Sequence, residues 1–253
     1  MEVYSDFSKV YDMFMENIPY KKWSKRIIQI LNGHGIYDGI VTDLGCGTGC
    51  LTQLLAEAGY DMIGIDYSMD MLEQAMEKRC ESGYDSILYL NQDMREFELY
   101  GTVRAIVCTC DSLNYLLEED EVLQVFKLVN NYLDPDGIFI FDITTKHKYL
   151  DIDNCVIAEN QEDASFIWEN TYFEEEKINE YELTLFIKDN EDGKYVKSVE
   201  IHQQRAYEIE ELVNLLDKAG LKTLKIEDAY TGKPYREMSE RILITASKKE
   251  SEV

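Results

Sequence analysis

Basic residues are scarce in this sequence. Its 253 residues include 25 lysines and arginines against 50 aspartates and glutamates, which gives a formal net charge of −25. Nucleic-acid phosphates would be repelled by such a field unless a local basic patch overrode it. The densest basic cluster has the spacing of a solvated helix face and comprises Lys21, Lys22, Lys25 and Arg26. We therefore expect no nucleic-acid partner.

Long apolar runs, cysteine pairs and histidines are also lacking. No stretch approaches the ~20 apolar residues of a membrane span, and the opening MEVYSDFSKVYD has no secretory-signal pattern. A cytoplasmic protein without membrane contact is expected. Three histidines and six cysteines with no C-x-x-C pair argue against a metal site or a disulfide framework. Hydrophobic residues still make up 45% of the chain, enough for a full core.

Strand and helix periods alternate over the first 142 residues. Helical spacing of apolar residues occurs at 51–58, 71–79 and 122–129, and short apolar runs predict strands at 40–44, 62–66, 86–90, 103–110 and 138–142. A turn at Asp134-Pro135-Asp136-Gly137 precedes the fifth strand. This alternation predicts a doubly wound, mostly parallel α/β sheet. Ligands of such sheets lie beyond the carboxyl ends of the strands.

The period changes to two between residues 164 and 205. Apolar residues alternate with polar ones on both sides of a turn at Asp192-Gly193, which predicts an antiparallel hairpin inserted after strand five. A helix follows the hairpin, and two strands at 223–229 and 241–247 come after that helix. We expect one domain over 1–253, with an N-terminal helical cap (1–35), a Rossmann-like core (36–145 and 206–248) and an antiparallel β insertion (146–205) covering the substrate pocket.

The stretch VTDLGCGTG, residues 41–49, places a glycine-rich turn directly after the first strand. Such a turn lets the main chain approach a nucleotide-like ligand without a Cβ clash. Dinucleotide sites use G-x-G-x-x-G, whereas Gly45, Gly47 and Gly49 follow G-x-G-x-G and are preceded by Asp43. An acid there would repel a pyrophosphate but can pair with an ammonium. The pattern favours a cationic cofactor with an amino-acid tail.

The next three strands also end in polar residues. Asp66 ends the second strand, about twenty residues on, where a carboxylate can accept ribose hydroxyls. Asp93 and Met94 follow the third strand and offer an acid and an apolar wall to an adenine ring. Residues 110–115, Cys-Asp-Ser-Leu-Asn-Tyr, follow the fourth strand, where chemistry would occur.

These motifs resemble those of the class I S-adenosylmethionine-dependent methyltransferases. The glycine loop, Asp66, Asp93-Met94 and the turn before strand five match in order and spacing. A closer resemblance, which covers nearly the whole chain, is to small bacterial methyltransferases related to glycine/sarcosine and amino-sugar N-methyltransferases. It rests on Phe7-x-x-x-Tyr11-Asp12, residues 110–115, the hairpin and Arg241-Ile242. The resemblance implies a seven-stranded sheet whose last strand is antiparallel. S-adenosyl-L-methionine would then contact Tyr11, Trp23, Asp43, Gly45, Cys46, Gly47, Gly49, Asp66, Tyr67, Met71, Asp93, Met94, Cys110 and Asn114.

The activity that this implies is in-line transfer of a methyl group to nitrogen or oxygen of a small-molecule acceptor, by a monomer or homodimer. Candidates for handling the acceptor are His147, Trp168, His202, Arg205, Tyr207 and Tyr230. Arg205 and Tyr207 could face the cavity and bind an anionic acceptor, or form a salt bridge at the rim. Transfer to RNA or protein, and cofactor binding without catalysis, are the alternatives. Residues 111–114, directly after strand four, contain no proline. Enzymes that methylate the amino groups of bases or glutamine usually have an Asn/Asp-Pro-Pro-aromatic stretch there.

Overall fold

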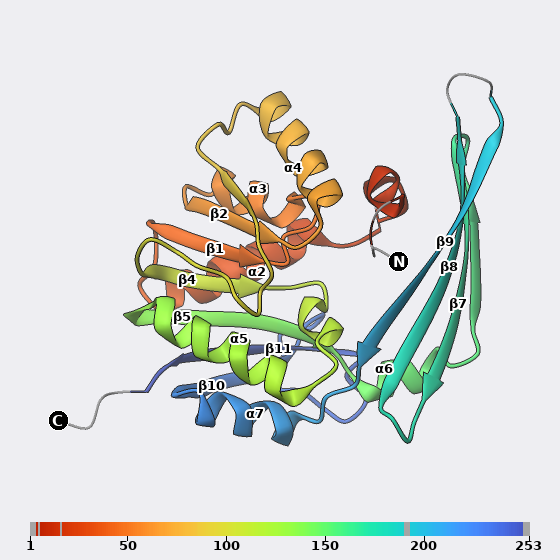
Figure 1. Cartoon of the computed structure of the whole chain (residues 1–253). Coiled ribbons are helices and arrows are strands. Elements are labelled where there is room, and N and C mark those ends of the chain that lie inside the picture. The colour runs from red at the N-terminus through yellow and green to blue at the C-terminus, as the bar shows by residue number, and fades with distance from the viewer. Residues whose placement is uncertain (1–3, 5, 16, 190–192, 250–253) are drawn as a thin grey trace.

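A computed structural model describes residues 4, 6–15, 17–189 and 193–249 and confirms the predicted doubly wound sheet (Figure 1). Seven strands pair in the order β10-β11-β5-β4-β1-β2-β3. The strand β11 is antiparallel to both neighbours, while the other pairs are parallel, as the resemblance implies. The strands are β1 (Ile40–Leu44), β2 (Asp61–Asp66), β3 (Leu88–Asn91), β4 (Val103–Cys108), β5 (Leu133–Thr144), β10 (Leu221–Asp228) and β11 (Arg241–Lys248).

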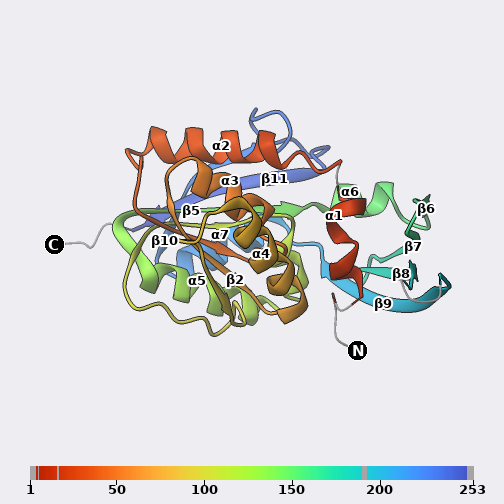
Figure 2. The ribbon, with the colours of Figure 1, turned by 90° about the horizontal axis from the view of Figure 1, so that it is seen from above.

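Helices cover both faces of this sheet (Figure 2). On one face, α2 and α3 bury Ile27, Leu31, Leu51 and Leu55 against β1 and β4; on the other, α5 and α7 bury a second apolar cluster that includes Phe126. Apolar residues on one side of each helix drive this layering. The helices are α2 (Tyr20–Gly33), α3 (Cys50–Glu57), α4 (Met69–Ser82), α5 (Glu119–Tyr132) and α7 (Ile209–Lys218). None of the described helices is long and apolar enough to cross a membrane.

Strand β5 begins five residues earlier than the sequence indicates. Leu133 pairs with Val103, and the next paired residues are Ile138 and Ala105. The expected turn at 134–137 is therefore an interruption of the pairing within β5, where four residues of one strand face one of the other. Extra residues in a ladder are accommodated as a bulge, so local turn chemistry did not end the strand.

The insertion is larger than the single hairpin expected. Four antiparallel strands form a second sheet in the order β6-β7-β8-β9, which curves away from the main sheet in Figure 1. It comprises β6 (Val156–Asn160), β7 (Ala164–Phe173), β8 (Ile178–Lys188) and β9 (Tyr195–Arg205), preceded by α6 (Lys146–Asp151). The strand β6 is short and mostly exposed, so its sequence carries no clear alternation. Asp192, in the predicted turn, lies outside the described residues.

The N-terminal segment packs between the main body and the second sheet. It contains the short helices η1 (Phe7–Lys9) and α1 (Tyr11–Phe14). Phe7, Val10 and Phe14 form an apolar cluster with residues of β7 and β8, including Phe166 and Leu183. Burying large apolar side chains stabilises such a contact by about 1.5–3 kcal/mol each. The cap thus joins the second sheet to the carboxyl ends of the main strands.

Candidate active site

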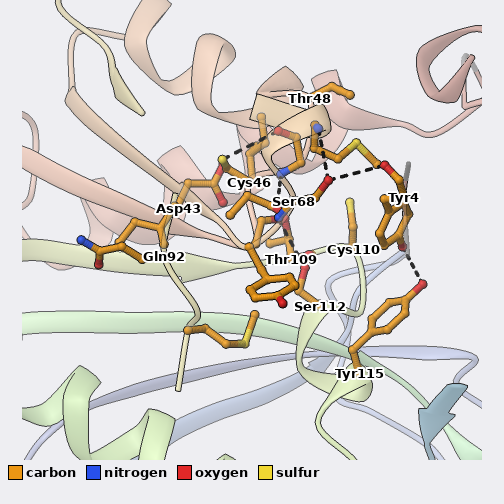
Figure 3. Close-up of a pocket in the computed structure, with 18 of the residues that line it drawn as sticks. Tyr4, Asp43, Cys46, Thr48, Ser68, Gln92, Thr109, Cys110, Ser112 and Tyr115 are labelled. Atoms are coloured by element: carbon orange, nitrogen blue, oxygen red, sulfur yellow. Dashed lines mark hydrogen bonds between the residues drawn. The ribbon is translucent and has the colours of Figure 1, made fainter. Parts of the chain in front are cut away.

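A cavity of about 440 Å³ lies at the carboxyl ends of β1, β2, β3 and β4 (Figure 3). The glycine loop after β1 forms one wall, and residues following the other three strands form the rest. The N-terminal segment contributes Tyr4, Tyr11 and Tyr20. The cavity therefore occupies the place where open α/β sheets bind ligands.

The three glycines of the loop have different roles. All have positive φ angles, which side chains disfavour. A Cβ on Gly45 would lie 2.6 Å from the Ser112 hydroxyl, and one on Gly49 would strike the Tyr89 hydroxyl, so those two glycines permit close packing. A Cβ on Gly47, at φ +54°, would meet nothing within 4 Å, and this residue lines the cavity. Gly47 is thus the glycine that leaves room for a ligand.

Asp43 is a buried carboxylate beside this loop. It is 2% exposed and accepts a hydrogen bond of 2.7 Å from the Thr52 hydroxyl. Burial raises the pKa of Asp43 to about 7, while the Thr52 hydrogen bond opposes that rise. No ion pair joins it to a described lysine, arginine or histidine. A buried carboxylate facing a cavity in this way is stabilised by a cationic ligand.

Asp66, at the end of β2, is held by backbone N–H groups. Gly47 and Ser68 each donate a hydrogen bond of 2.8 Å to it, one to each carboxylate oxygen. Burial raises its pKa, and these hydrogen bonds oppose the rise. Each oxygen keeps a lone pair for a further donor. Asp66 can therefore accept hydroxyl groups from a ligand while it fixes the glycine loop.

The third strand end supplies Gln92, Asp93, Met94 and Arg95 to the cavity wall. The Asp93 carboxylate is engaged by Arg95, whose guanidinium lies 2.5 Å away and also contacts Glu121. An exposed pair of this kind adds little stability but fixes the orientation of the acid. Met94 lines the cavity beside this acid.

The end of β4 has a strained backbone. Cys110 and Asp111 have consecutive positive φ angles of 58° and 53°. Their N–H groups donate to Asp142 of β5 at 3.2 and 2.8 Å, and Arg241 bridges Asp111 and Asp142 at 2.5 and 3.0 Å. Surrounding bonds of this kind maintain strain at functional sites. Burial raises the pKa of the Cys110 thiol, so it stays neutral and is a poor nucleophile.

A second cavity of about 190 Å³ adjoins the first. Five residues line both cavities and so mark their junction: Tyr4, Tyr11, Tyr20, Cys110 and Tyr115. The second cavity also receives residues from α6, β7, β8 and β9, whereas the first receives none from the insertion. The insertion therefore forms part of the wall of the second cavity and no part of the wall of the first.

A chain of hydrogen bonds runs from this junction into β9. The Tyr4 and Tyr115 hydroxyls are 2.5 Å apart, Tyr115 lies 3.2 Å from His202 Nδ1, and His202 Nε2 lies 3.2 Å from Glu200. Burial would raise the pKa of Glu200, but His202 and backbone N–H groups, including that of Phe7, lower it overall. Because the ionised carboxylate only accepts hydrogen bonds, His202 Nε2 donates to Glu200.

Eleven of the fourteen residues predicted to contact the cofactor line the first cavity: Tyr11, Asp43, Gly45, Cys46, Gly47, Asp66, Tyr67, Met71, Asp93, Met94 and Cys110. Trp23 lies instead on the second cavity, where its ring is 5.4 Å from the Arg241 guanidinium. Gly49 and Asn114 line neither cavity. Gly49 is the N-cap residue of α3 and packs against Tyr89.

Asn114 is fully buried and joins three segments. Its Nδ2 donates to the carbonyls of Thr144 and Arg205 at 3.1 and 2.8 Å, and its Oδ1 accepts from the Thr144 N–H at 3.0 Å. Asn114→Ala would leave these groups unpaired and is expected to lower the free energy of unfolding by about 2–4 kcal/mol. Denaturant unfolding measures this. An unchanged unfolding midpoint would contradict the structural role.

The acceptor-side candidates separate by strand register. Tyr181 pairs with His202 and Ile178 with Arg205, so His202 and Gln204 face the second cavity and Arg205 does not. Arg205 forms a salt bridge with Glu119, which is the second of the two roles that the sequence left open for this residue. Tyr207 is buried, with its hydroxyl 2.5 Å from the Leu116 carbonyl. Among the candidates, Trp168, His202 and Tyr230 line the second cavity, whereas His147, Arg205 and Tyr207 line neither.

Several lining residues were missed by the sequence reasoning. Gln92, Arg95 and Thr109 are next in sequence to the predicted motif residues Asp93-Met94 and Cys110, and this proximity could have indicated them. Tyr4 and Tyr20 come from the N-terminal segment, where an aromatic on a helix face has the same pattern whether it enters a core or a cavity. No group of three or more potential metal ligands occurs among the residues that the structure describes.

The strand order and the glycine loop define a doubly wound enzyme with a nucleotide-type cofactor site. A family described as "Methyltransferase domain" matches residues 41–137. A relative from Geobacillus sp. (strain WCH70), named "Putative methyltransferase", is 35% identical over 97% of this chain and 99% of its own length. The chain belongs to the class I S-adenosylmethionine-dependent methyltransferases.

Solved structures agree with this assignment. An S-adenosylmethionine-dependent methyltransferase from Clostridium acetobutylicum is 29% identical with a TM-score of 0.86, and the match covers 98% of this chain and 99% of that one. The sugar N-methyltransferase KedS8 from Streptoalloteichus sp. shares the fold at 18% identity, with a TM-score of 0.79 over 99% of this chain and 97% of its own. S-adenosylmethionine is the cofactor, and the buried Asp43 together with the open space at Gly47 fits it.

Proposed function

We propose that this enzyme transfers a methyl group to a nitrogen or oxygen atom of a small molecule that occupies the second cavity. The junction of the two cavities carries the proposal. A cofactor in the first cavity and an acceptor in the second would meet at Cys110 and Tyr115. The small volume of the second cavity and the net charge of −25 favour a small acceptor over RNA. The shared fold of KedS8, a sugar N-methyltransferase, is consistent with it.

In this proposal, each end of the cofactor meets a separate part of the chain. Asp43 would pair with the ammonium group, Asp66 would accept the ribose hydroxyls, and Asp93 with Met94 would hold the adenine. When bound, S-adenosylmethionine supplies an electrophilic methyl group on a sulfonium. The tyrosines at the junction would exclude water and keep the acceptor in line. Orientation of two reactants can contribute up to ~7–11 kcal/mol.

The acceptor side of the site belongs to the insertion and the cap. Trp168, Tyr181 and Gln204 reach the second cavity from β7, β8 and β9. The insertion would thus cover the substrate pocket, as the sequence predicts. The hydrogen-bonded tyrosines lead from the junction to His202. No covalent enzyme intermediate is needed.

Cofactor affinity is expected to rise with pH below about pH 7. Burial raises the pKa of Asp43 to about 7, so the free protein at pH 6 holds this carboxyl largely protonated. Pairing with an ammonium requires the ionised form, so binding releases a proton and tightens by up to about tenfold per pH unit, levelling off above pH 7. Calorimetry from pH 5.5 to 8 measures this. Asp43→Asn should bind weakly and without the slope; a flat profile for the native enzyme would refute the role of Asp43.

A transfer assay tests the proposed function. The enzyme is incubated with methyl-labelled S-adenosylmethionine and pools of amines, amino sugars and hydroxylated metabolites, and S-adenosylhomocysteine is quantified. We expect label in the acid-soluble fraction. Label in the acid-precipitable fraction would indicate a macromolecular acceptor instead. Tight cofactor binding without transfer to any pool would indicate a binding protein.

A further inference from the structure

The second cavity is walled largely by aromatic rings. Nine of its twenty lining residues are phenylalanine, tyrosine or tryptophan. Trp168 and Tyr181 meet at 79° with ring centroids 5.0 Å apart, and Tyr20 and Trp23 meet at 81° at 6.0 Å. Rings inclined so steeply meet edge to face rather than stack, and we call the nine aromatic lining residues the aromatic box. Such boxes attract organic cations, because the face of each ring carries negative charge.

Both cations in the wall of this cavity are already engaged. Arg241 lies 2.5 Å from Asp111 and 3.0 Å from Asp142, and Lys148 lies 3.1 Å from Glu240. These arginine, lysine, Asp111 and Glu240 side chains all line the cavity, while Asp142 lies buried behind it. An anionic acceptor would therefore have to break an existing ion pair. A cation meets no unpaired positive charge among the described lining residues.

The negative charge behind the wall adds to this preference. Glu200, 3% exposed, lies behind His202, and its pKa is lowered overall although burial would raise it, so it is ionised at neutral pH. Asp142 is the second acid bonded to the single guanidinium of Arg241. The field of these groups favours a positive charge in the cavity at distances where water is excluded.

Methylation of an amine creates such a charge. The nitrogen lone pair forms the new N–C bond, and the electrons of the breaking S–C bond remain on sulfur. The cofactor becomes a neutral thioether and the acceptor becomes an ammonium ion. The positive charge therefore moves from the first cavity into the second, where the aromatic walls can stabilise it.

We propose that the second cavity is a site for aliphatic amines that carry no carboxylate or phosphate, and that its aromatic box binds their methylated ammonium products. The proposal rests on the proposed function only for the assignment of this cavity to the acceptor. It narrows the acceptors of the proposed function, which include both nitrogen and oxygen compounds, to amines.

The two tryptophans provide a direct test. Trp23 and Trp168 are the only tryptophans in the chain, and both line this cavity. Intrinsic fluorescence of the whole enzyme therefore reports its occupancy. Three probes would be titrated: choline, its uncharged isostere 3,3-dimethyl-1-butanol, and glycine betaine, which bears the same trimethylammonium group and a carboxylate.

Choline is expected to bind at least about tenfold more tightly than either other probe. Equal binding of the uncharged isostere would remove the cation preference, and tighter binding of glycine betaine would overturn the exclusion of anionic groups. Failure of choline to change the fluorescence or to give heat in calorimetry would also overturn the proposal.

Matched variants separate the aromatic box from the rest of the site. Tyr230 is 37% exposed at the edge of the cavity, so its replacement should be tolerated by the fold. Tyr230→Leu should weaken choline binding about threefold to tenfold, while Tyr230→Phe, which keeps the ring, should not. Equal binding by both variants would exclude a contribution from this ring.

The outcomes also separate this inference from the proposed function. Asp66→Asn should weaken cofactor binding and leave choline binding unchanged, because Asp66 lines only the first cavity. Choline binding without methyl transfer to any acceptor would contradict the proposed function alone. Methyl transfer to an anionic acceptor would contradict this inference alone.

Discussion

Gly47→Val is expected to reduce cofactor affinity by about 100-fold or more while the protein remains folded. The valine would adopt φ +54°, a conformation that β-branched residues strongly disfavour. Its side chain would also enter the first cavity, where a Cβ meets no protein atom within 4 Å and only a ligand could compete for the space. Calorimetric titration with S-adenosylmethionine measures the loss, and circular dichroism checks the fold.

Gly83→Val is the matched control for this change. Gly83 has φ +75°, and a Cβ there would also meet open space, but it ends α4 and lines neither cavity. The Gly83→Val variant should have a lower melting temperature because of the backbone strain, and its cofactor affinity should be unchanged. Similar loss of affinity in both variants would mean that strain, not exclusion of the ligand, explains the result for Gly47.

Asp66→Asn is expected to weaken cofactor binding by roughly 2–4 kcal/mol, about 30-fold to 1000-fold. The native carboxylate accepts the N–H groups of Gly47 and Ser68 on its two oxygens and has lone pairs left for ligand hydroxyls. An asparagine has one acceptor oxygen, so its NH₂ group would face one of these backbone donors. The variant loses both a ligand contact and the support of the glycine loop.

Asp61→Asn gives the comparison at the other end of the same strand. Asp61 is the first residue of β2, is exposed, and lies away from both cavities. The Asp61→Asn variant should bind the cofactor with the affinity of the native enzyme. Calorimetry on both variants decides the matter: equal affinities would exclude a role for Asp66 in holding the cofactor.

Sequence pattern was informative where the backbone itself forms the feature. The alternation of periods predicted a doubly wound, mostly parallel sheet, and the family resemblance implied its seven strands. The spacing of Gly45, Gly47 and Gly49 after Asp43 placed the glycine loop at its edge. These features are local, because a turn, a strand and the first residues of a helix are contiguous in the chain. The residues at strand ends then meet because carboxyl ends of parallel strands share one edge.

The sequence failed where position depends on packing between distant segments. The resemblance implied a cofactor contact for Asn114, yet Asn114 lines neither cavity and bonds to Thr144 and Arg205, which are 30 and 91 residues away. Arg205 and Gln204 are adjacent in sequence, and only the register with β8 decides which faces the cavity. A shift of one residue exchanges the two faces of a strand.

The chain alone therefore determined the doubly wound core, the loop for a cationic nucleoside and the acids that surround it, because these follow from short-range backbone geometry. Tertiary structure alone decided that Tyr4, Trp23, Trp168 and Tyr230 form a common aromatic enclosure. Their separation along the chain gives no local signal. Burial of apolar surface between the cap, the insertion and the core brings them together.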